Sequence, residues 1–247
     1  MIYLILDEVD STNNYVAAHA GELADMTMVV AASQTSGRGQ RGNVWESEPG
    51  ANLTFTLYHE PRGLEPRRQF ELSMSAALAM ARYLQGFDWG AGACIKWPND
   101  IYVGNRKIAG ILIENSVTTA SIEHTRIGIG LNVNQTEFRG DAPNPVSMAM
   151  LAGRRFDLDN VRRGVADMLE RHLAALDAEN AGASLVSQFE SLLWRHDGKP
   201  HAFREPASGI TYQGCIIGVD ATGPISIQNV STLERKEYRF KEIEFVL

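Results

Sequence analysis

A loop rich in glycine and arginine is the stretch of this chain best suited to chemistry. Residues 37–42 read GRGQRG and lie between the apolar segments 28–32 and 51–57, both predicted to be strands. The glycines let backbone N–H groups approach a ligand closely, while Arg38 and Arg41 add fixed positive charge and forked donors. This combination favours an anion, most often a phosphate or a carboxylate.

The same loop matches the G-x-G-x-x-G pattern of dinucleotide-binding folds, but its surroundings do not. That pattern requires a helix to begin at the glycines, whereas residues 43–50, NVWESEPG, place a proline and a glycine there. The acidic residue expected about 20 residues further on is also missing. A P-loop is excluded because Asn43 and Val44 follow Gly42, where Lys and Ser or Thr are required. On its own, the loop leaves an anion site and a solvated hairpin equally open.

A second group of residues favours the anion site over the solvated hairpin. The segment KWPND, residues 96–100, begins with Lys96 between an apolar strand end and Trp97-Pro98, so we expect a partly buried, fixed ammonium. An unpaired buried cation costs roughly 3–5 kcal/mol. Asp100 is the one nearby acid in the sequence, so a ligand carboxylate or phosphate is a natural partner for this cation.

The hydrophobic pattern predicts the elements that position these groups. Strands are predicted at residues 2–6, 28–32, 51–57, 106–114 and 126–133, and helices at 66–87, 159–178 and 184–195. A short helix follows Asp10 and Ser11-Thr12-Asn13, a polar cluster that either caps the helix or offers donors to a ligand. Gly128 and Gly130 lie inside a strand, which often marks close approach of a ligand or backbone. From residue 197 onward, short strands and turns predict a small barrel.

Composition narrows the class of protein. A chain of 247 residues fits one large domain, or one plus a small one, and the net charge of −7 argues against general nucleic-acid binding. The two cysteines, Cys94 and Cys215, lie far from each other and from other metal-ligating residues, which excludes a Cys-rich metal site and fits a reducing compartment. No signal pattern or long apolar run occurs, so we expect a cytoplasmic protein that does not bind membranes.

Several short motifs, taken together and in order, resemble one family. They are Ser11-Thr12-Asn13, Gln34-Thr35-Ser36-Gly37-Arg38-Gly39, Trp45, Lys96-Trp97-Pro98-Asn99-Asp100, Lys107-Ile108-Ala109-Gly110 and Gly128-Ile129-Gly130-Leu131-Asn132-Val133. Each motif alone is weak, but the ordered combination over residues 2–134 closely resembles the biotin protein ligases, also called biotin–[acetyl-CoA-carboxylase] ligases.

The resemblance implies a fold and an activity. The fold would be α+β, with a mixed sheet flanked by helices as in class II aminoacyl-tRNA synthetases over residues 1–196, and a small SH3-like β-barrel over 197–247. The activity would be activation of biotin with MgATP to biotinyl-5′-AMP, followed by transfer to one lysine of a biotin carboxyl carrier domain. The expected cofactors and substrates are therefore biotin, ATP and Mg²⁺, and the protein could assemble as a homodimer.

The resemblance also implies roles for individual residues. Lys96 and Arg38 would be the catalytic cations, with Lys96 touching both the biotin carboxylate and the α-phosphate. Biotin would be held by Ser11, Thr12, Asn13, Gln34, Gly37, Arg38, Gly39, Gln40 and Lys96. The adenylate would be held by Arg38, Gln40, Arg41, Trp45, Lys96 and Asn132. Lys107 lies in a matched motif without an assigned ligand, and Mg²⁺ would be held mainly by phosphates, not by side chains.

Two departures from the family pattern affect these expectations. Gln40 and Asn43 stand where many relatives have arginine, which weakens the expected retention of biotinyl-AMP. Longer relatives carry an N-terminal DNA-binding domain, whereas the motifs here begin at Ser11, so we expect a ligase without repressor function. The alternatives are a lipoate or octanoate ligase of the same fold and a non-catalytic biotin or nucleotide sensor.

Overall fold

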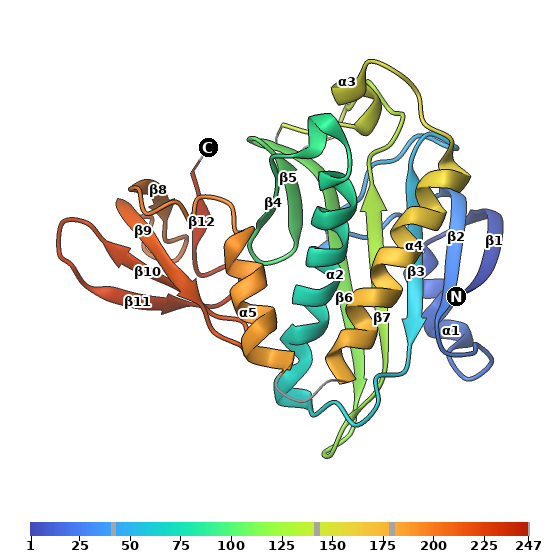
Figure 1. The fold of residues 1–247 in the computed structure, drawn as a ribbon, viewed down its shortest axis with the longest axis horizontal. Helices are drawn as coiled ribbons and strands as arrows, with labels where there is room; N and C mark the ends of the chain where they lie inside the picture. The colour runs from blue at the N-terminus through green and yellow to red at the C-terminus, as the bar shows by residue number, and fades with distance from the viewer. Residues whose placement is uncertain (41–42, 141–143, 178–180, 247) are drawn as a thin grey trace.

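The computed structural model of the protein contains two β-sheets and the helices that cover them (Figure 1). It describes residues 1–40, 43–140, 144–177 and 181–246. The first sheet has seven strands in the order β1-β2-β3-β7-β6-β5-β4. The β1–β2 pair is parallel and the remaining pairs are antiparallel, so the sheet is mixed, as expected.

The strands of the first sheet follow the apolar segments of the sequence. They are β1 (Ile2–Val9), β2 (Thr27–Gln34), β3 (Leu53–His59), β4 (Ala93–Lys96), β5 (Asp100–Val103), β6 (Arg106–Val117) and β7 (Ile122–Leu131). Because side chains alternate between the two faces of a strand, β3 and β7 each present two kinds of surface. Phe55 and Ile129 join the buried apolar core on one face. Thr56 and Gly128 lie opposite each other on the other face, where a ligand can approach.

The helices are α1 (Thr12–His19), α2 (Gln69–Gln85), α3 (Met148–Ala152), α4 (Leu158–Ala174) and α5 (Ala181–Ser191). Helix α1 lies on the sheet face that carries Thr56 and Gly128, whereas α2 and α4 cover the apolar face. Helices α2 and α4 run side by side in front of the sheet (Figure 1). The predicted stripe of α2 is buried, with Met74, Leu78 and Ala81 fully covered, because apolar residues at helical spacing share one face.

The second sheet lies at the C-terminal end of the chain, beyond α5 (Figure 1). Its five antiparallel strands, in the order β11-β10-β9-β8-β12, are β8 (His201–Arg204), β9 (Thr211–Val219), β10 (Ile225–Asn229), β11 (Arg235–Tyr238) and β12 (Glu244–Phe245). This arrangement fits the expected SH3-like unit. The barrel expected there is not closed within the described residues, because β11 and β12 are the two edges of the sheet.

Hydrogen bonds and a common core join the second sheet to α5 and to the turn after β4. The indole Nε1 of Trp97 donates to the carbonyl of Gly223 at 2.9 Å, and the backbone N–H of Val219 donates to Glu190 Oε1 at 2.8 Å. Phe203 and Ile216 of the second sheet belong to the same buried apolar cluster as the residues beneath α2. The second sheet is therefore packed against the first and buries apolar surface with it.

Most predicted elements are present, and the differences lie at their ends. The helix predicted at residues 66–87 begins as a 3₁₀ turn, Pro66–Arg68, because proline suits the first turn but cannot donate within the helix. The helix predicted at 184–195 starts earlier and ends at Ser191. Gly104, between β5 and β6, has a φ of 61°, which glycine adopts without strain. The short helix α3 was not predicted.

Candidate active site

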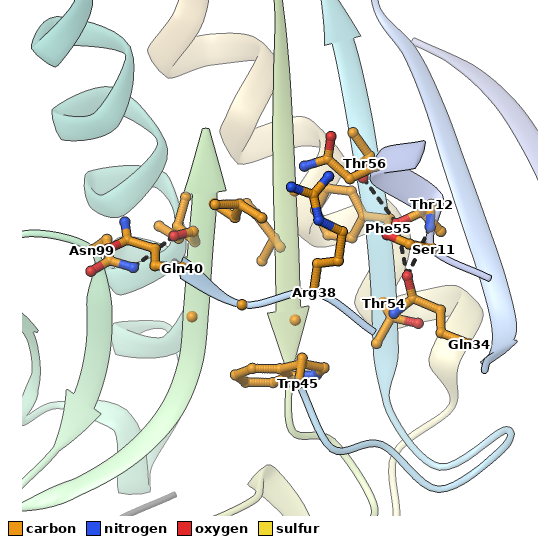
Figure 2. A pocket seen from close by; sticks show the side chains of 18 of the residues that line it. Ser11, Thr12, Gln34, Arg38, Gln40, Trp45, Thr54, Phe55, Thr56 and Asn99 are labelled. Carbon is orange, nitrogen blue, oxygen red and sulfur yellow. Dashed lines mark hydrogen bonds between the residues drawn. The ribbon is translucent and has the colours of Figure 1, made fainter. Parts of the chain in front are cut away.

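A cavity of about 480 Å³, counting the space at its mouth, opens beneath the glycine loop, on the sheet face that carries Thr56 and Gly128 (Figure 2). Its lining combines uncharged polar groups, cations and glycines, and includes Ser11, Thr12, Asn13, Gln34, Arg38, Gly39, Gln40, Trp45, Thr54, Thr56, Asn99, Asp100, Lys107, Gly110, Leu112, Gly128 and Gly130. Segments far apart in the sequence therefore meet in one site.

The corner of the cavity near α1 is built from uncharged polar side chains. The Oε1 of Gln34 accepts from the backbone N–H of Thr12 at 2.8 Å and from its hydroxyl at 3.2 Å, and that hydroxyl also bonds Thr56 Oγ1 at 2.9 Å. Asn13 is 3% exposed, and neither its Nδ2 nor its Oδ1 has a partner in the described structure. A buried amide without partners costs free energy, so this corner is suited to a ligand that both donates and accepts.

Ser11 stands at the N-cap of α1, but its side chain makes no capping hydrogen bond. Asp10 is occupied differently, because its Oδ2 accepts from Asn14 Nδ2 at 2.6 Å. The sequence left capping and ligand binding open for this polar cluster. With no cap bond from Ser11, its buried position on the cavity wall favours ligand binding.

The floor at the opposite end is a cross-strand pair of glycines. Gly110 of β6 lies opposite Gly130 of β7, and the ring of Trp45 rests on both. A Cβ added at Gly130 would come within 2.6 Å of three ring atoms, and one at Gly110 would lie 3.0 Å from the ring. Any side chain here would displace the indole. The indole Nε1 is buried without a partner, so it offers an unused donor at this end.

Two cations flank the cavity, and each is paired with a carboxylate. Lys107 Nζ lies 2.7 Å from Asp100 Oδ1 and 5.7 Å from the centre of the Trp45 ring, with one fifth of its side chain exposed. The Arg38 guanidinium donates to Glu114 Oε1 at 3.0 Å and to Asn14 Oδ1 at 3.0 Å. Figure 2 shows Arg38 crossing the middle of the site between the Thr12 corner and Gln40. An anion entering here would meet positive charge from two directions.

Gln40 lines the cavity near Asn99 (Figure 2). Its Oε1 is buried without a partner, whereas Asn99 is occupied because its Nδ2 donates to the carbonyl of Ile111 at 2.7 Å. Gln40 therefore presents an unused acceptor where the family pattern has a cation. Arg41, the neighbouring residue with an expected role, lies outside the described residues. Gly37, also expected to bind the ligand, is buried and does not line this cavity, but it lines an adjoining groove.

The structure places Lys96 away from this cavity, contrary to the expectation that it touches both anions. Its Nζ bonds the Tyr102 hydroxyl at 3.2 Å and lies 5.2 to 6.0 Å from the centres of the Tyr102, Phe245 and Trp194 rings. Burial lowers the pKa of Lys96, while Asp100 opposes this shift. The physical reason is topological: β4 is the edge strand, so Lys96 extends toward the second sheet, while Lys107 on β6 lines the cavity.

Asn132, expected beside the nucleotide, lies just beyond the end of β7. Its Nδ2 donates to the carbonyl of Val146 at 3.1 Å, and its buried Oδ1 has no partner in the described structure. Asn132 is absent from the cavity lining, although the backbone N–H of Asn132 bonds the Ile108 carbonyl on the strand that carries Lys107. The structure thus leaves one buried amide oxygen without a partner just beyond β7.

Several lining residues were missed by sequence reasoning. Thr54, Thr56, Asn99, Asp100 and Leu112 line the cavity without having been assigned a role. The alternation of Thr54 and Thr56 within an apolar strand was an available signal, because it places two hydroxyls on one face.

No group of three or more His, Cys, Asp or Glu side chains suited to a metal occurs among the described residues. Within the same residues, no helix is long and apolar enough to cross a membrane.

The fold and cavity define an α+β protein that can bind a small anionic ligand between a polar corner and an aromatic platform. Residues 6–132, about half of the chain, match the Biotin/lipoate A/B protein ligase family. A biotin–[acetyl-CoA-carboxylase] ligase from Paracoccus denitrificans is 34% identical over 179 residues, which cover 70% of this chain and 73% of that protein. The chain belongs to the biotin/lipoate A/B protein ligase family.

Other relatives and a solved structure are also similar to this chain. The bifunctional ligase/repressor BirA of Escherichia coli (strain K12) is 34% identical over 194 residues, covering 76% of this chain and 58% of that protein. Four such bifunctional relatives are matched over only 43% to 63% of their own length. A biotin protein ligase from Aquifex aeolicus, solved with biotin and ATP, has the same fold, with a TM-score of 0.78, 23% identity and coverage of 98% and 97% of the two chains.

Proposed function

We propose that this chain is a biotin protein ligase that joins biotin to AMP and then transfers biotin to a lysine of a carrier domain. The observation that carries the proposal is one cavity with a polar corner at one end, the Trp45 ring with Lys107 at the other, and Arg38 between them. Relatives named as biotin ligases, among them those from Paracoccus denitrificans and Mycobacterium tuberculosis, support the choice of biotin.

The polar corner suits the ureido ring of biotin, which presents two N–H donors and one carbonyl. The unpaired Oδ1 and Nδ2 of Asn13 offer an acceptor and a donor, and Thr12, Gln34 and Ser11 complete the wall. Binding of such a ligand would satisfy buried groups that are otherwise unpaired. We therefore assign this corner to the head of biotin.

The cationic region suits the carboxylate and the α-phosphate. We assign Lys107, not Lys96, to the contact with both anions, because Lys107 lines the cavity and Asp100 fixes its ammonium. Arg38 would add the second positive charge. A carboxylate oxygen attacks the α-phosphorus, a new P–O bond forms, and the bond to pyrophosphate breaks. Neutralising and aligning two anions carries this step, so no nucleophile from the protein is needed.

The nucleotide end would hold the adenosine half of the ligand. Trp45 offers its ring face and its unpaired Nε1, and Gln40 offers an unpaired oxygen. Mg²⁺ would arrive on the phosphates and neutralise their charge. The buried, unpaired Oδ1 of Asn132 fits a metal or nucleotide contact, because Mg²⁺ prefers oxygen ligands and keeps few from the protein.

The acceptor would be a biotin carboxyl carrier domain of a biotin-dependent carboxylase. Its lysine amine would attack the carbonyl carbon of biotinyl-AMP, forming the amide and releasing AMP. Residues 197–247, a second domain that shares its core with residues 1–196 in our proposal, would help to receive this partner. The exposed edge strand β1, with Ile2 and Ile5 more than half exposed, supports a homodimer. The net charge of −7 supports a role without DNA binding, and the free Cys94 and Cys215 fit a cytoplasmic location.

Pyrophosphate release tests the proposal directly. The purified chain, incubated with MgATP, should release pyrophosphate only when biotin is added, and the mass of an added carrier domain should rise by one biotin. Lipoate or octanoate in place of biotin should give neither result. Pyrophosphate release with lipoate but not with biotin would identify the alternative ligase, and binding of biotin or ATP without any release would identify a sensor.

A further inference from the structure

Glu46 directly follows the aromatic platform residue Trp45 and fastens a distant segment of the chain to it. Its Oε1 accepts from the backbone N–H of Arg139 at 2.8 Å, and its Oε2 accepts from the backbone N–H of Gly140 at 2.6 Å. Gln135 Nε2 lies 3.4 Å from Oε1 as a third, longer contact. One carboxylate thus receives two consecutive backbone donors, and hydrogen bonds to a charged acceptor are stronger than those to a neutral one.

The segment held by Glu46 is anchored by hydrogen bonds before and after residues 139–140. Before it, the Oε1 of the buried Gln135 accepts from Asn52 Nδ2 at 2.6 Å. After it, the backbones of Asn144 and Val146 exchange hydrogen bonds with Lys107 at 3.0 and 2.9 Å. The same segment therefore also bonds the backbone of Lys107, whose ammonium lines the cavity. Between these anchors, Glu46 ties residues 139–140 to the chain that carries Trp45.

Gly140 is shaped for this contact. A Cβ added there would lie 2.7 Å from Glu46 Oε2, closer than side chains normally approach. The backbone of Gly140 is outside the left-handed region, so alanine would not strain the chain and would act only by displacing the carboxylate. Glycine at this position allows the carboxylate to reach the backbone.

We propose that Glu46 is a positioning residue for the nucleotide half of the site, an inference that rests on the proposed function. Its carboxylate holds residues 139–140 and Trp45 together. The indole therefore stays on the glycine pair Gly110 and Gly130, and this end of the cavity is closed around the adenosine. The polar corner that would bind biotin lies at the other end, at Thr12 and Gln34 (Figure 2). Loss of the carboxylate should therefore weaken nucleotide binding while leaving biotin binding unchanged.

Two variants disrupt the contact between Glu46 and Gly140, one at each residue. Glu46→Gln keeps the size of the side chain but removes the charge, and Gly140→Ala pushes the intact carboxylate away. Glu48→Gln is the matched control, because it removes a negative charge only two residues from Glu46. The Glu48 side chain is exposed and makes no hydrogen bond in the described part of the chain. The measurements are KM for ATP, kcat for pyrophosphate release, Kd for biotin alone, and hydrogen exchange over residues 135–140.

We expect both test variants to raise KM for ATP about 10-fold, as loss of a charge-assisted hydrogen bond does. The Kd for biotin should stay within about twofold, and exchange over residues 135–140 should quicken. Glu48→Gln should match the wild type in all four. A KM for ATP unchanged in both variants, or an equal loss of biotin affinity, would overturn the positioning role alone. A wild-type chain that releases no pyrophosphate with biotin would overturn the proposed function and, with it, this inference.

Discussion

Replacing Lys107 and Lys96 in turn decides which lysine serves the reacting anions. Lys107 is one-fifth exposed and lies 2.7 Å from Asp100, whereas Lys96 is enclosed by three aromatic rings outside the cavity. Removing the charge partner of a largely buried anion costs about 3–5 kcal/mol. If that loss falls on the transition state, Lys107→Ala should slow formation of biotinyl-AMP by roughly 100- to several-thousand-fold.

Lys96→Met should behave differently, because methionine keeps the volume and the contact with the aromatic rings. We expect it to form biotinyl-AMP within about tenfold of the wild-type rate, a barrier change of about 1.4 kcal/mol. The assay is the single-turnover rate of biotinyl-AMP formation at saturating biotin and MgATP, with the thermal unfolding midpoint of each variant measured alongside.

Asp100 complicates the first variant, since Lys107→Ala leaves it without its partner. The double variant Lys107→Ala/Asp100→Asn removes that charge, so it should recover thermal stability without recovering the adenylation rate. A rate that recovers together with stability would mean that Lys107 acts on folding and not on the anions. A large loss in Lys96→Met, with Lys107→Ala close to wild type, would refute our assignment and restore the role first expected for Lys96.

Three further predictions concern charge and order around the site. Gln40→Arg should slow dissociation of preformed biotinyl-AMP about 5- to 30-fold, because a charge-assisted bond exceeds a neutral one by roughly 1–2 kcal/mol; an unchanged stopped-flow off-rate would contradict this. Burial lowers the pKa of Lys96, so the unfolded chain binds this proton more tightly and stability should rise with pH between the folded pKa and the ordinary value of 10.5. Chemical denaturation across that range should find a smaller rise in Lys96→Met, and equal slopes in both proteins would disprove it. The segments at residues 37–42 and 135–147 should exchange their amide hydrogens more slowly with biotin plus ATP; equal rates with and without ligand would rule out ordering by the ligand.

The sequence predicted the sheet and the long helices because their apolar periodicity is strong. Strands β2, β3 and β7 and helix α2 lie where residues such as Met28, Phe55 and Met74 repeat at the expected spacing. The ends of the helices were predicted less well. The first turn at Pro66 and the last turn of α4 depend on local hydrogen bonds, which the apolar periodicity does not indicate.

The site was harder to predict than the fold, because it depends on which strands become neighbours. Gly110 and Gly130 read as separate strand glycines, and only the β6–β7 register makes them one platform. Lys96 and Lys107 both stand in motifs, and their order in the sheet, with β4 at its edge, decides which one lines the cavity. The hydrogen bond from Gly140 to Glu46 joins residues 94 positions apart, and no local sequence pattern indicates it.

The shared core of the two sheets has a consequence for cooperativity. Phe203 and Ile216 are buried with the residues beneath α2, and Trp97 reaches across to Gly223, so cutting the chain near residue 197 would uncover apolar surface on both pieces. We expect the two sheets to unfold as one unit. A ligand at 100 times its Kd, bound wholly within the first sheet, would then add about 2.7 kcal/mol to the stability of β9 and β10 as well. The slowest amides of the C-terminal sheet would report occupancy of a cavity whose lining includes none of its residues.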